Sequence, residues 1–230
     1  GGSELNASSS NIDQRVSALK EAGVKIMTRT TAFGLYDYGV AGLLERITDH
    51  QSLPSEYDPR QRFWTVRTKH IILATGAIER PIAFGNNDRP GVMSVTAAHT
   101  YLNRFAILPG KKIIICTNND SAYLPALELS EAGAEVKLLD ARSGIEDSLS
   151  EKALRKGVDL QMNAAPLNVN GSRGVKSLDI AFEKENQWQR GNTELCDLIL
   201  VSGGWSPVVH LLSHRGIRPI WDKQNACFVS

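Results

Sequence analysis

The chain has 230 residues, of which 42% are hydrophobic and 22% charged, a composition typical of an ordinary globular protein. Its 26 Lys and Arg residues are balanced by 25 Asp and Glu residues, so the formal net charge of +1 gives no indication of binding to nucleic acid or an anionic membrane. The longest apolar runs are far too short to span a bilayer, and we expect no signal peptide. Three cysteines, odd in number and far apart, indicate neither a disulfide framework nor a metal cluster, and they predict a reducing, cytoplasmic location.

The first third of the chain is predicted to hold one helix and several strands. The sequence begins Gly-Gly-Ser without an initiator Met, from which we expect a fragment or a processed chain. Residues 7–10 read as a loop, and a cap at 11–13 predicts a helix that ends at Gly23. A polar stretch at 49–61 holds two prolines and predicts a long loop whose tip moves. Apolar runs predict strands at 24–28, 31–38, 40–48, 63–68 and 71–73, the last of them buried.

The clearest unit of the sequence lies between residues 110 and 141. A strand at 111–116, a helix at 121–132 that ends at Gly133, and a strand at 135–139 have the lengths that a parallel crossover requires. The alternation of strands and helices predicts an α/β fold with parallel sheets. The other predicted elements are helices at 94–105 (capped by Ser94), at 150–156 (capped by Ser148 or Ser150) and after 204–207, and strands at 158–162, 167–169, 175–183 and 195–202.

Three predicted strands end in small residues, at 74–76, 117–119 and 202–204. Ligands of doubly wound sheets lie at the carboxyl ends of strands, where glycine lets the backbone approach a phosphate closely. Each end alone is more often a turn than a ligand site. All three in one chain indicate a protein that handles dinucleotides.

The middle strand end departs from the dinucleotide fingerprint. Thr117, Asn119 and Ala122 stand where Gly-x-Gly-x-x-Gly has its glycines, although Asn119 still tolerates a left-handed backbone. Asp140 follows 23 residues after Thr117, where an acid would hold a ribose hydroxyl; the alternative is a solvated strand end. Asp120 adds negative charge where a phosphate would lie.

The remaining candidates for chemistry favour structural roles. His210 and His214 are four residues apart on a predicted helix, a spacing that suits two zinc ligands, but no third ligand is visible in the sequence. Ser121 and Ser206 have no base at hand and do not resemble a nucleophile elbow. We therefore predict no metal site and no catalytic residue.

Six collinear runs carry a resemblance that extends over nearly the whole chain: 29–34, 71–81, 84–93, 100–104, 117–123 and 201–211. Together they resemble the alpha subunit of heterotetrameric sarcosine oxidase. The runs Asn-Asn-Asp-Arg-Pro-Gly (86–91) and Ser-Gly-Gly-Trp-Ser-Pro (202–207) are specific to the resemblance, whereas Ala-Thr-Gly (74–76) is shared by many flavoproteins with two dinucleotide-binding domains.

The resemblance implies a glutathione-reductase-like α/β fold with parallel sheet layers. Residues 1–108 with 194–230 are expected to form a partial, split first nucleotide-binding domain, and residues 109–193 an inserted, Rossmann-like second domain. The first domain is expected to be incomplete, because this chain lacks the first strand and the Gly-x-Gly-x-x-Gly loop. The folate domain of the family is also absent from it.

The resemblance also implies binding residues and cofactors. The family binds NAD in the alpha subunit, shares FMN between the alpha and beta subunits, and holds FAD in the beta subunit. Flavins carry out the chemistry, and the protein positions them. The residues expected to line the first dinucleotide site are Gly1, Gly2, Thr75, Gly76 and Ala77, with Gly203 and Gly204 beside them, while Asn119, Ser121 and Asp140 belong to a second, degenerate site.

The implied function is that of an oxidoreductase subunit. With beta, gamma and delta subunits, such a complex oxidatively demethylates sarcosine to glycine, and tetrahydrofolate captures the formaldehyde in the domain that this chain lacks. The isolated chain is expected to be inactive. One alternative is a catalytically silent scaffold with vestigial nucleotide sites. Another is a subunit like those of opine oxidase or cyanide synthase, against which the 86–89 and 202–205 runs argue.

Overall fold

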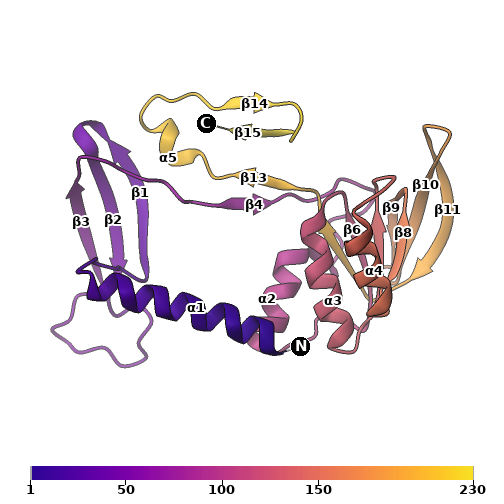
Figure 1. Ribbon diagram of the computed structural model, residues 1–230, viewed down its shortest axis with the longest axis horizontal. Helices are drawn as coiled ribbons and strands as arrows, with labels where there is room; N and C mark the ends of the chain where they lie inside the picture. Colours follow the sequence, from indigo (N-terminus) through magenta and orange to yellow (C-terminus); the bar gives the residue numbers. More distant parts are fainter. Residues whose placement is uncertain (1, 230) are drawn as a thin grey trace. The chain divides into compact units, whose positions relative to one another are not determined.

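The computed structural model describes residues 2–229 and divides into two compact units (Figure 1). One unit comprises Gly1–Ala77 and Pro207–Ser230, and the other comprises Ile78–Ser206. The chain passes between them along two short strands, β4 (Ala77–Glu79) and β13 (Trp205–Pro207). These units are defined by contacts within the chain, whereas the predicted domains are defined by nucleotide binding. The predicted domains, with borders near residues 108 and 193, therefore stay a prediction.

A five-stranded parallel sheet forms the centre of the 78–206 unit, in the order β5-β12-β6-β7-β8. The chain runs from β6 through helix α3 to β7, so the predicted parallel crossover is confirmed. The α/β fold class is confirmed as well. The strands are β5 (Val92–Ser94), β6 (Lys112–Thr117), β7 (Glu135–Asp140), β8 (Asp159–Met162) and β12 (Leu198–Ser202).

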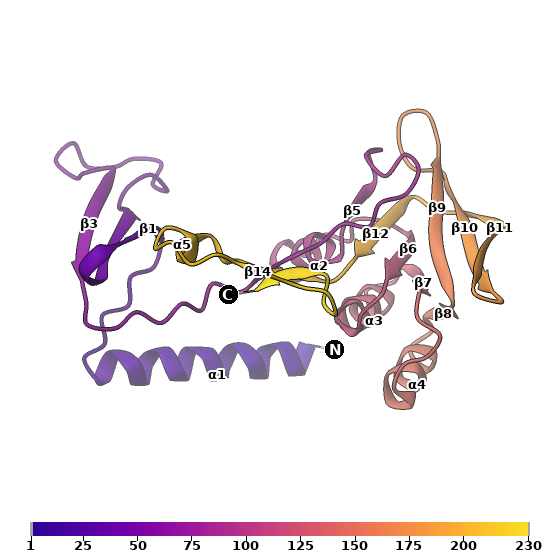
Figure 2. The ribbon, with the colours of Figure 1, turned by 90° about the horizontal axis from the view of Figure 1, so that it is seen from above.

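The two faces of this sheet have different covers (Figures 1 and 2). Ile113 and Ile115 of β6 pack in a core with helices α2, α3 and α4, whereas Ile114 and Cys116 point to the other face. This alternation follows from the two-residue period of a strand. An antiparallel sheet of β9, β10 and β11 covers the second face. The elements are α2 (Val95–Phe105), α3 (Tyr123–Glu131), α4 (Asp147–Arg155), β9 (Ala164–Asn170), β10 (Ser177–Lys184) and β11 (Gln187–Leu195), and the short 3-10 turn η2 (Asp120–Ala122) leads into α3.

The other unit is built on a three-stranded antiparallel sheet in the order β1-β2-β3. Among the side chains that the structure describes in this unit, those of residues 11–77 and 207–229, the only buried apolar ones are Leu35, Ala41 and Cys227. Its elements are α1 (Gly2–Glu21), β1 (Thr30–Tyr36), η1 (Asp37–Gly39), β2 (Val40–Arg46), β3 (Gln61–Arg67), α5 (His210–Ser213), β14 (Ile220–Asp222) and β15 (Cys227–Val229).

Several predicted elements of the 1–77 segment were wrong. Residues 7–10 (Ala-Ser-Ser-Ser) lie within α1, because alanine favours a helix and each serine costs a helix interior only a few tenths of a kcal/mol. Residues 24–28 and 71–73 form no strand, and Ile72 is 92% exposed. An isolated apolar run needs a neighbouring strand to pair with, and no described strand pairs with either segment.

Other corrections concern the 78–230 segment. Ser94 caps α2 as predicted, with its hydroxyl accepting from the Ala97 amide. Neither Ser148 nor Ser150 caps α4, whose N-cap position is held by Glu146 without a side-chain bond. The predicted strand at 195–202 is divided between the end of β11 and β12, and β11, β14 and β15 were missed.

Candidate functional site

The strand order reverses between β6 and β12, which is where an open parallel sheet usually binds its ligands. Thr117 ends β6, Ser202 ends β12, and the two lie in register. Thr117 is also in register with Asp140, the last residue of β7. The fold thus brings the predicted residues Asn119, Ser121 and Asp140 to one edge of the sheet, beside the start of α3.

The loop after β6 forms hydrogen bonds across this crevice. The Asn119 amide nitrogen Nδ2 donates to the Ser202 carbonyl oxygen at 3.0 Å and lies 3.2 Å from its hydroxyl. The Thr117 hydroxyl lies 3.2 Å from the same carbonyl. Side chains of the loop therefore join the ends of β6 and β12.

The same loop also satisfies its own backbone amides. The Asn119 amide donates to Thr117 Oγ1 at 3.2 Å, and the Ser121 amide donates to Asn119 Oδ1 at 3.1 Å. Asn119 is the N-cap of η2 and is extended, with φ −152°, rather than left-handed. The Trp205 indole donates to the Ser121 hydroxyl at 3.0 Å. Two donors that could face an anion are thus already in use.

Asp140 is fully buried, so the alternative of a solvated strand end was wrong. The Tyr123 hydroxyl donates to Asp140 Oδ2 at 2.8 Å. Arg142 donates to Oδ1 from its amide and from Nε, each at 3.0 Å, and to Oδ2 from Nη2 at 2.7 Å. Arg142 Nη1 also lies 2.7 Å from Asp120 Oδ1, so this guanidinium joins two carboxylates.

These contacts raise the pKa values of both side chains that bond to Asp140. Burial, followed by the hydrogen bond to Asp140, raises the pKa of Tyr123 above its ordinary value. The hydrogen bond to Asp140 is the largest influence on Arg142 and raises its pKa, against the opposing effect of burial. Tyr123 therefore stays neutral and Arg142 stays charged near neutral pH.

Gly203 and Gly204 pack against the chain that follows β4. The Gly203 amide donates to the Arg80 carbonyl and the Arg80 amide donates to the Gly204 carbonyl, each at 2.8 Å. A Cβ on Gly203 would lie 2.8 Å from the Pro81 carbonyl oxygen, and Gly204 has a φ of +98°. The close packing against Arg80 and Pro81 therefore explains why glycine stands at both positions, without any ligand.

Thr75, Gly76 and Ala77 belong to the other unit and lie exposed. The Thr75 hydroxyl donates to the Val208 carbonyl at 2.8 Å, and the Val208 amide donates to the Gly76 carbonyl at 3.0 Å. Gly76 has a φ of +70°, and a Cβ there would meet no atom within 4 Å. The backbone at Gly76 is therefore open to a close approach from outside.

The remaining predicted residues form no site in the described part of the chain. Gly1 lies outside the described residues, and Gly2 is the first residue of α1. His210 begins the four-residue helix α5 and His214 follows its end, so the predicted pair does not share a longer helix. Residues 2–229 contain no group of His, Cys, Asp and Glu side chains that could hold a metal ion.

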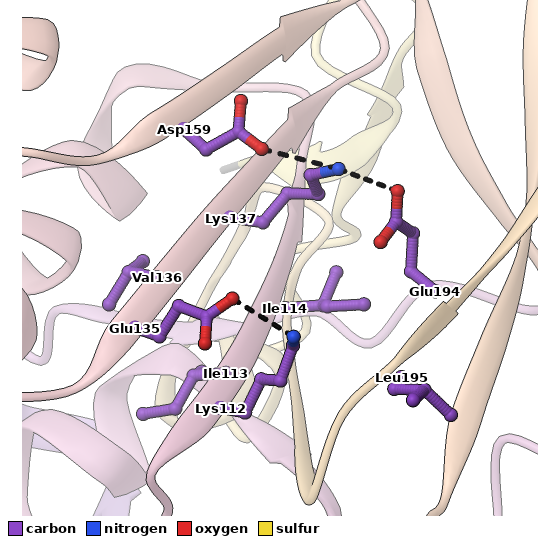
Figure 3. Close-up of a pocket in the computed structure, with 9 residues that line it drawn as sticks. All are labelled: Lys112, Ile113, Ile114, Glu135, Val136, Lys137, Asp159, Glu194 and Leu195. Atoms are coloured by element: carbon purple, nitrogen blue, oxygen red, sulfur yellow. Dashed lines mark hydrogen bonds and ion pairs between the residues drawn. The ribbon is translucent and has the colours of Figure 1, made fainter.

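Sequence reasoning missed a charged pocket at the opposite edge of the parallel sheet (Figure 3). It has a volume of about 110 Å³ and is formed at the amino ends of β6, β7 and β8 together with Glu194 and Leu195 of β11. Lys137 lies between Asp159, at 3.2 Å, and Glu194, at 2.7 Å (Figure 3). Lys112 pairs with Glu135 at 3.0 Å. Each cation already has a carboxylate partner, so the pocket serves to join strands.

Arg142 and Tyr123 were also missed as partners of Asp140. The arginine could have been found from the Asp-x-Arg spacing, because the two side chains of residues i and i+2 of an extended segment share one face. The tyrosine had no such signal, since it meets Asp140 only through the crossover helix.

Comparison with known proteins confirms the predicted resemblance. The chain is 37% identical over 210 residues to the sarcosine oxidase alpha subunit of Rhizobium meliloti, a match that covers 90% of this chain and 20% of the relative. It is 38% identical over 207 residues to the alpha subunit from Corynebacterium sp. strain U-96, covering 88% of this chain and 21% of that one. A subunit of opine oxidase from Rhizobium meliloti is 24% identical, over 70% of this chain and 40% of its own length. The chain therefore spans about a fifth of the sarcosine oxidase subunits that it matches.

Solved structures with similar folds include two reductases. Thioredoxin reductase of T. acidophilum has a TM-score of 0.64 at 12% identity, over 93% of this chain and 64% of its own. The NAD-dependent persulfide reductase of A. fulgidus has a TM-score of 0.61 at 13% identity, over 90% of this chain and 36% of its own. No protein-family model matches the chain. No described helix is long and apolar enough to cross a membrane.

Proposed function

We propose that this chain is the nucleotide-binding part of an alpha subunit of the sarcosine oxidase type. The observation that carries the proposal is the 37% identity to such a subunit over 90% of this chain. In this proposal the complete assembly oxidatively demethylates sarcosine to glycine, and beta, gamma and delta subunits accompany the alpha subunit. Tetrahydrofolate takes up the formaldehyde at a domain outside this chain.

The cofactors belong to the same proposal. NAD binds to the alpha subunit, FMN is shared with the beta subunit, and FAD is held by the beta subunit. When bound, the flavins accept the electrons of the amine. The isolated chain is then inactive, and its own task is to bind and orient a nucleotide. The three buried, free thiols support a reducing, cytoplasmic location.

Within this chain we assign NAD to the backbone at Thr75, Gly76 and Ala77. The open space at Gly76 and its φ of +70° support this assignment, because only a residue without a Cβ leaves the backbone accessible there. Gly2 is assigned to the same site by resemblance.

The test is a calorimetric titration of the 230-residue chain with NAD. A dissociation constant of roughly micromolar or tighter is expected, and the Gly76→Ala variant should weaken it at least about tenfold. Gly23→Ala is the matched control, since Gly23 has a φ of +79° and is equally open, but lies at the end of α1. Equal binding by both variants, or an affinity far weaker than micromolar in the parent chain, contradicts the assignment.

The second candidate function is a catalytically silent scaffold. It is favoured by one observation, the absence of every fingerprint glycine at Thr117, Asn119 and Ala122. It predicts no saturable NAD binding in the same titration. A subunit like that of opine oxidase is less well supported, at 24% identity.

A further inference from the structure

We infer that the crevice between β6 and β12 takes no dinucleotide in this protein and that its loop is an internal strut joining the two strands. This goes beyond the proposed function, which places NAD at Thr75–Ala77. Three independent features of the crevice support it: its backbone amides, its carboxylates and the bonds across it.

The first feature concerns the pyrophosphate of a dinucleotide. Such a group is held by free backbone amides at the start of the helix after the first strand. Here the amides of Asn119 and Ser121 already donate to side chains of their own loop. The next residue after Asn119 is Asp120, whose side chain is 58% exposed and carries a negative charge. A pyrophosphate would lose these two donors and meet a carboxylate.

The second feature concerns the ribose. An acid at the end of the second strand holds ribose hydroxyls by accepting their hydrogen bonds. A carboxylate has about four lone-pair sites. Those of Asp140 are taken by Tyr123 and by three donors of Arg142. No acceptor remains for a ribose hydroxyl.

The same set of charges also excludes a 2′-phosphate. An arginine near this position can hold the 2′-phosphate of NADP. Arg142 is instead paired with both Asp120 and Asp140, so the three side chains carry a net charge of −1. An added phosphate would be repelled by this set.

The third feature is mechanical. Asn119 and Thr117 bond to Ser202 at the point where the strand order reverses. These bonds link strands that are 85 residues apart in the sequence. The loop thus joins β6 to β12 in the place where related folds bind a cofactor.

Hydrogen–deuterium exchange of the full chain with NAD or NADP at about 1 mM locates any bound nucleotide. We expect the exchange of peptides covering 117–124 and 140–142 to stay unchanged. Protection of residues 74–78 alone supports both this inference and the proposed function. Protection nowhere supports the inference and contradicts the proposed NAD site. Protection at 117–124 or 140–142 overturns the inference.

Variants of Asn119 test the strut without any ligand. Asn119→Ala removes the bonds to Ser202 together with the cap bond from the Ser121 amide, and it should lower Tm by about 3–6 °C. Asn119→Asp keeps the Oδ1 that caps η2 and removes only the Nδ2 donor, so it should lower Tm as well, whereas a residue that only binds a ligand would leave the ligand-free Tm almost unchanged. Asn118→Ala is the matched control, because Asn118 is exposed and its side chain accepts a bond from its neighbour Asn119 rather than from another strand. Equal Tm values for Asn119→Ala and the parent chain would overturn the inference.

Discussion

Asp140 shows how a single residue can satisfy a sequence pattern for a different reason. Its position at the end of the second strand was predicted from the spacing of a nucleotide fold, and the parallel register with Thr117 places it at the expected edge of the sheet. Its burial could not be predicted, because it depends on Tyr123 and Arg142 closing over the carboxylate. The spacing of an acid therefore predicts where it lies, while its partners decide what it can bind.

Replacing Asp140 by asparagine should be costly. The change removes the charge that faces Arg142 and leaves a half-buried guanidinium with only Asp120, so we expect a loss of about 3 kcal/mol in the free energy of unfolding. Urea unfolding measures it. Asp120→Asn is the matched control, since its ion pair is exposed and should contribute less than about 1 kcal/mol. Equal losses from the two variants would contradict this account of the cluster.

Lys137 provides a second residue-scale test, through pH. Its hydrogen bond is the largest influence that lowers the pKa of Glu194 below the ordinary 4.5. A lowered pKa stabilises the folded state above the unfolded value, and this contribution disappears as the pH falls through the folded value. Burial is the largest single influence on the pKa of Lys137 and lowers it, but the bonds to Glu194 and Asp159 together outweigh burial, so the pKa is raised.

The Lys137→Met variant should therefore be less stable than the parent chain at neutral pH. The difference should shrink as the pH falls below about 4.5, where Glu194 becomes protonated in the unfolded chain and then in the folded one. Chemical denaturation across the acid range measures the difference. Lys184→Met, on the exposed end of β10, serves as the control. A difference that stays constant across the acid range would contradict the coupling.

At the scale of elements, the sequence predicted secondary structure correctly where an element contacts elements that lie close to it in the chain. The β6–α3–β7 crossover was predicted because the apolar strands, the helix and Gly133 all lie within one stretch, and Gly133 has the expected positive φ of +100°. The prediction of a strand at 71–73 was wrong, because a strand needs another strand to pair with and no described strand pairs with this segment. The glycines at 203–204 were located correctly as a special backbone position, but the atoms that require them belong to Arg80 and Pro81.

This explanation of the 203–204 glycines can be tested by adding a methyl group. Gly203→Ala would push a Cβ against the carbonyl oxygens of Pro81 and Arg80, and we expect a loss of about 1–3 kcal/mol. Thermal unfolding measures it. Gly144→Ala should be close to neutral, because a Cβ there meets nothing within 4 Å and its φ is not positive. An unchanged Tm for Gly203→Ala would favour a ligand-based reason for the glycine.

At the scale of the whole molecule, the two units differ in how much apolar surface each buries. Of the side chains described in the first unit, at 11–77 and 207–229, only Leu35, Ala41 and Cys227 are buried and apolar. The 78–206 unit holds two clusters, one on each face of its parallel sheet. Since apolar burial is the main favourable contribution to folding, the first unit should open at a lower free energy.

Limited proteolysis of the 230-residue chain should therefore cut the two units in a definite order. We expect the first cuts at 49–60 or 68–76, which lack regular hydrogen-bonded structure, and the survival of a fragment close to 78–206. The exposed turn between β9 and β10, at 171–174, is an internal comparison, because it is a loop within the larger core. Mass spectrometry of the early fragments identifies the cuts. First cleavage at 171–174, with β1–β3 intact, would show that the unit with less apolar burial is not the less stable one.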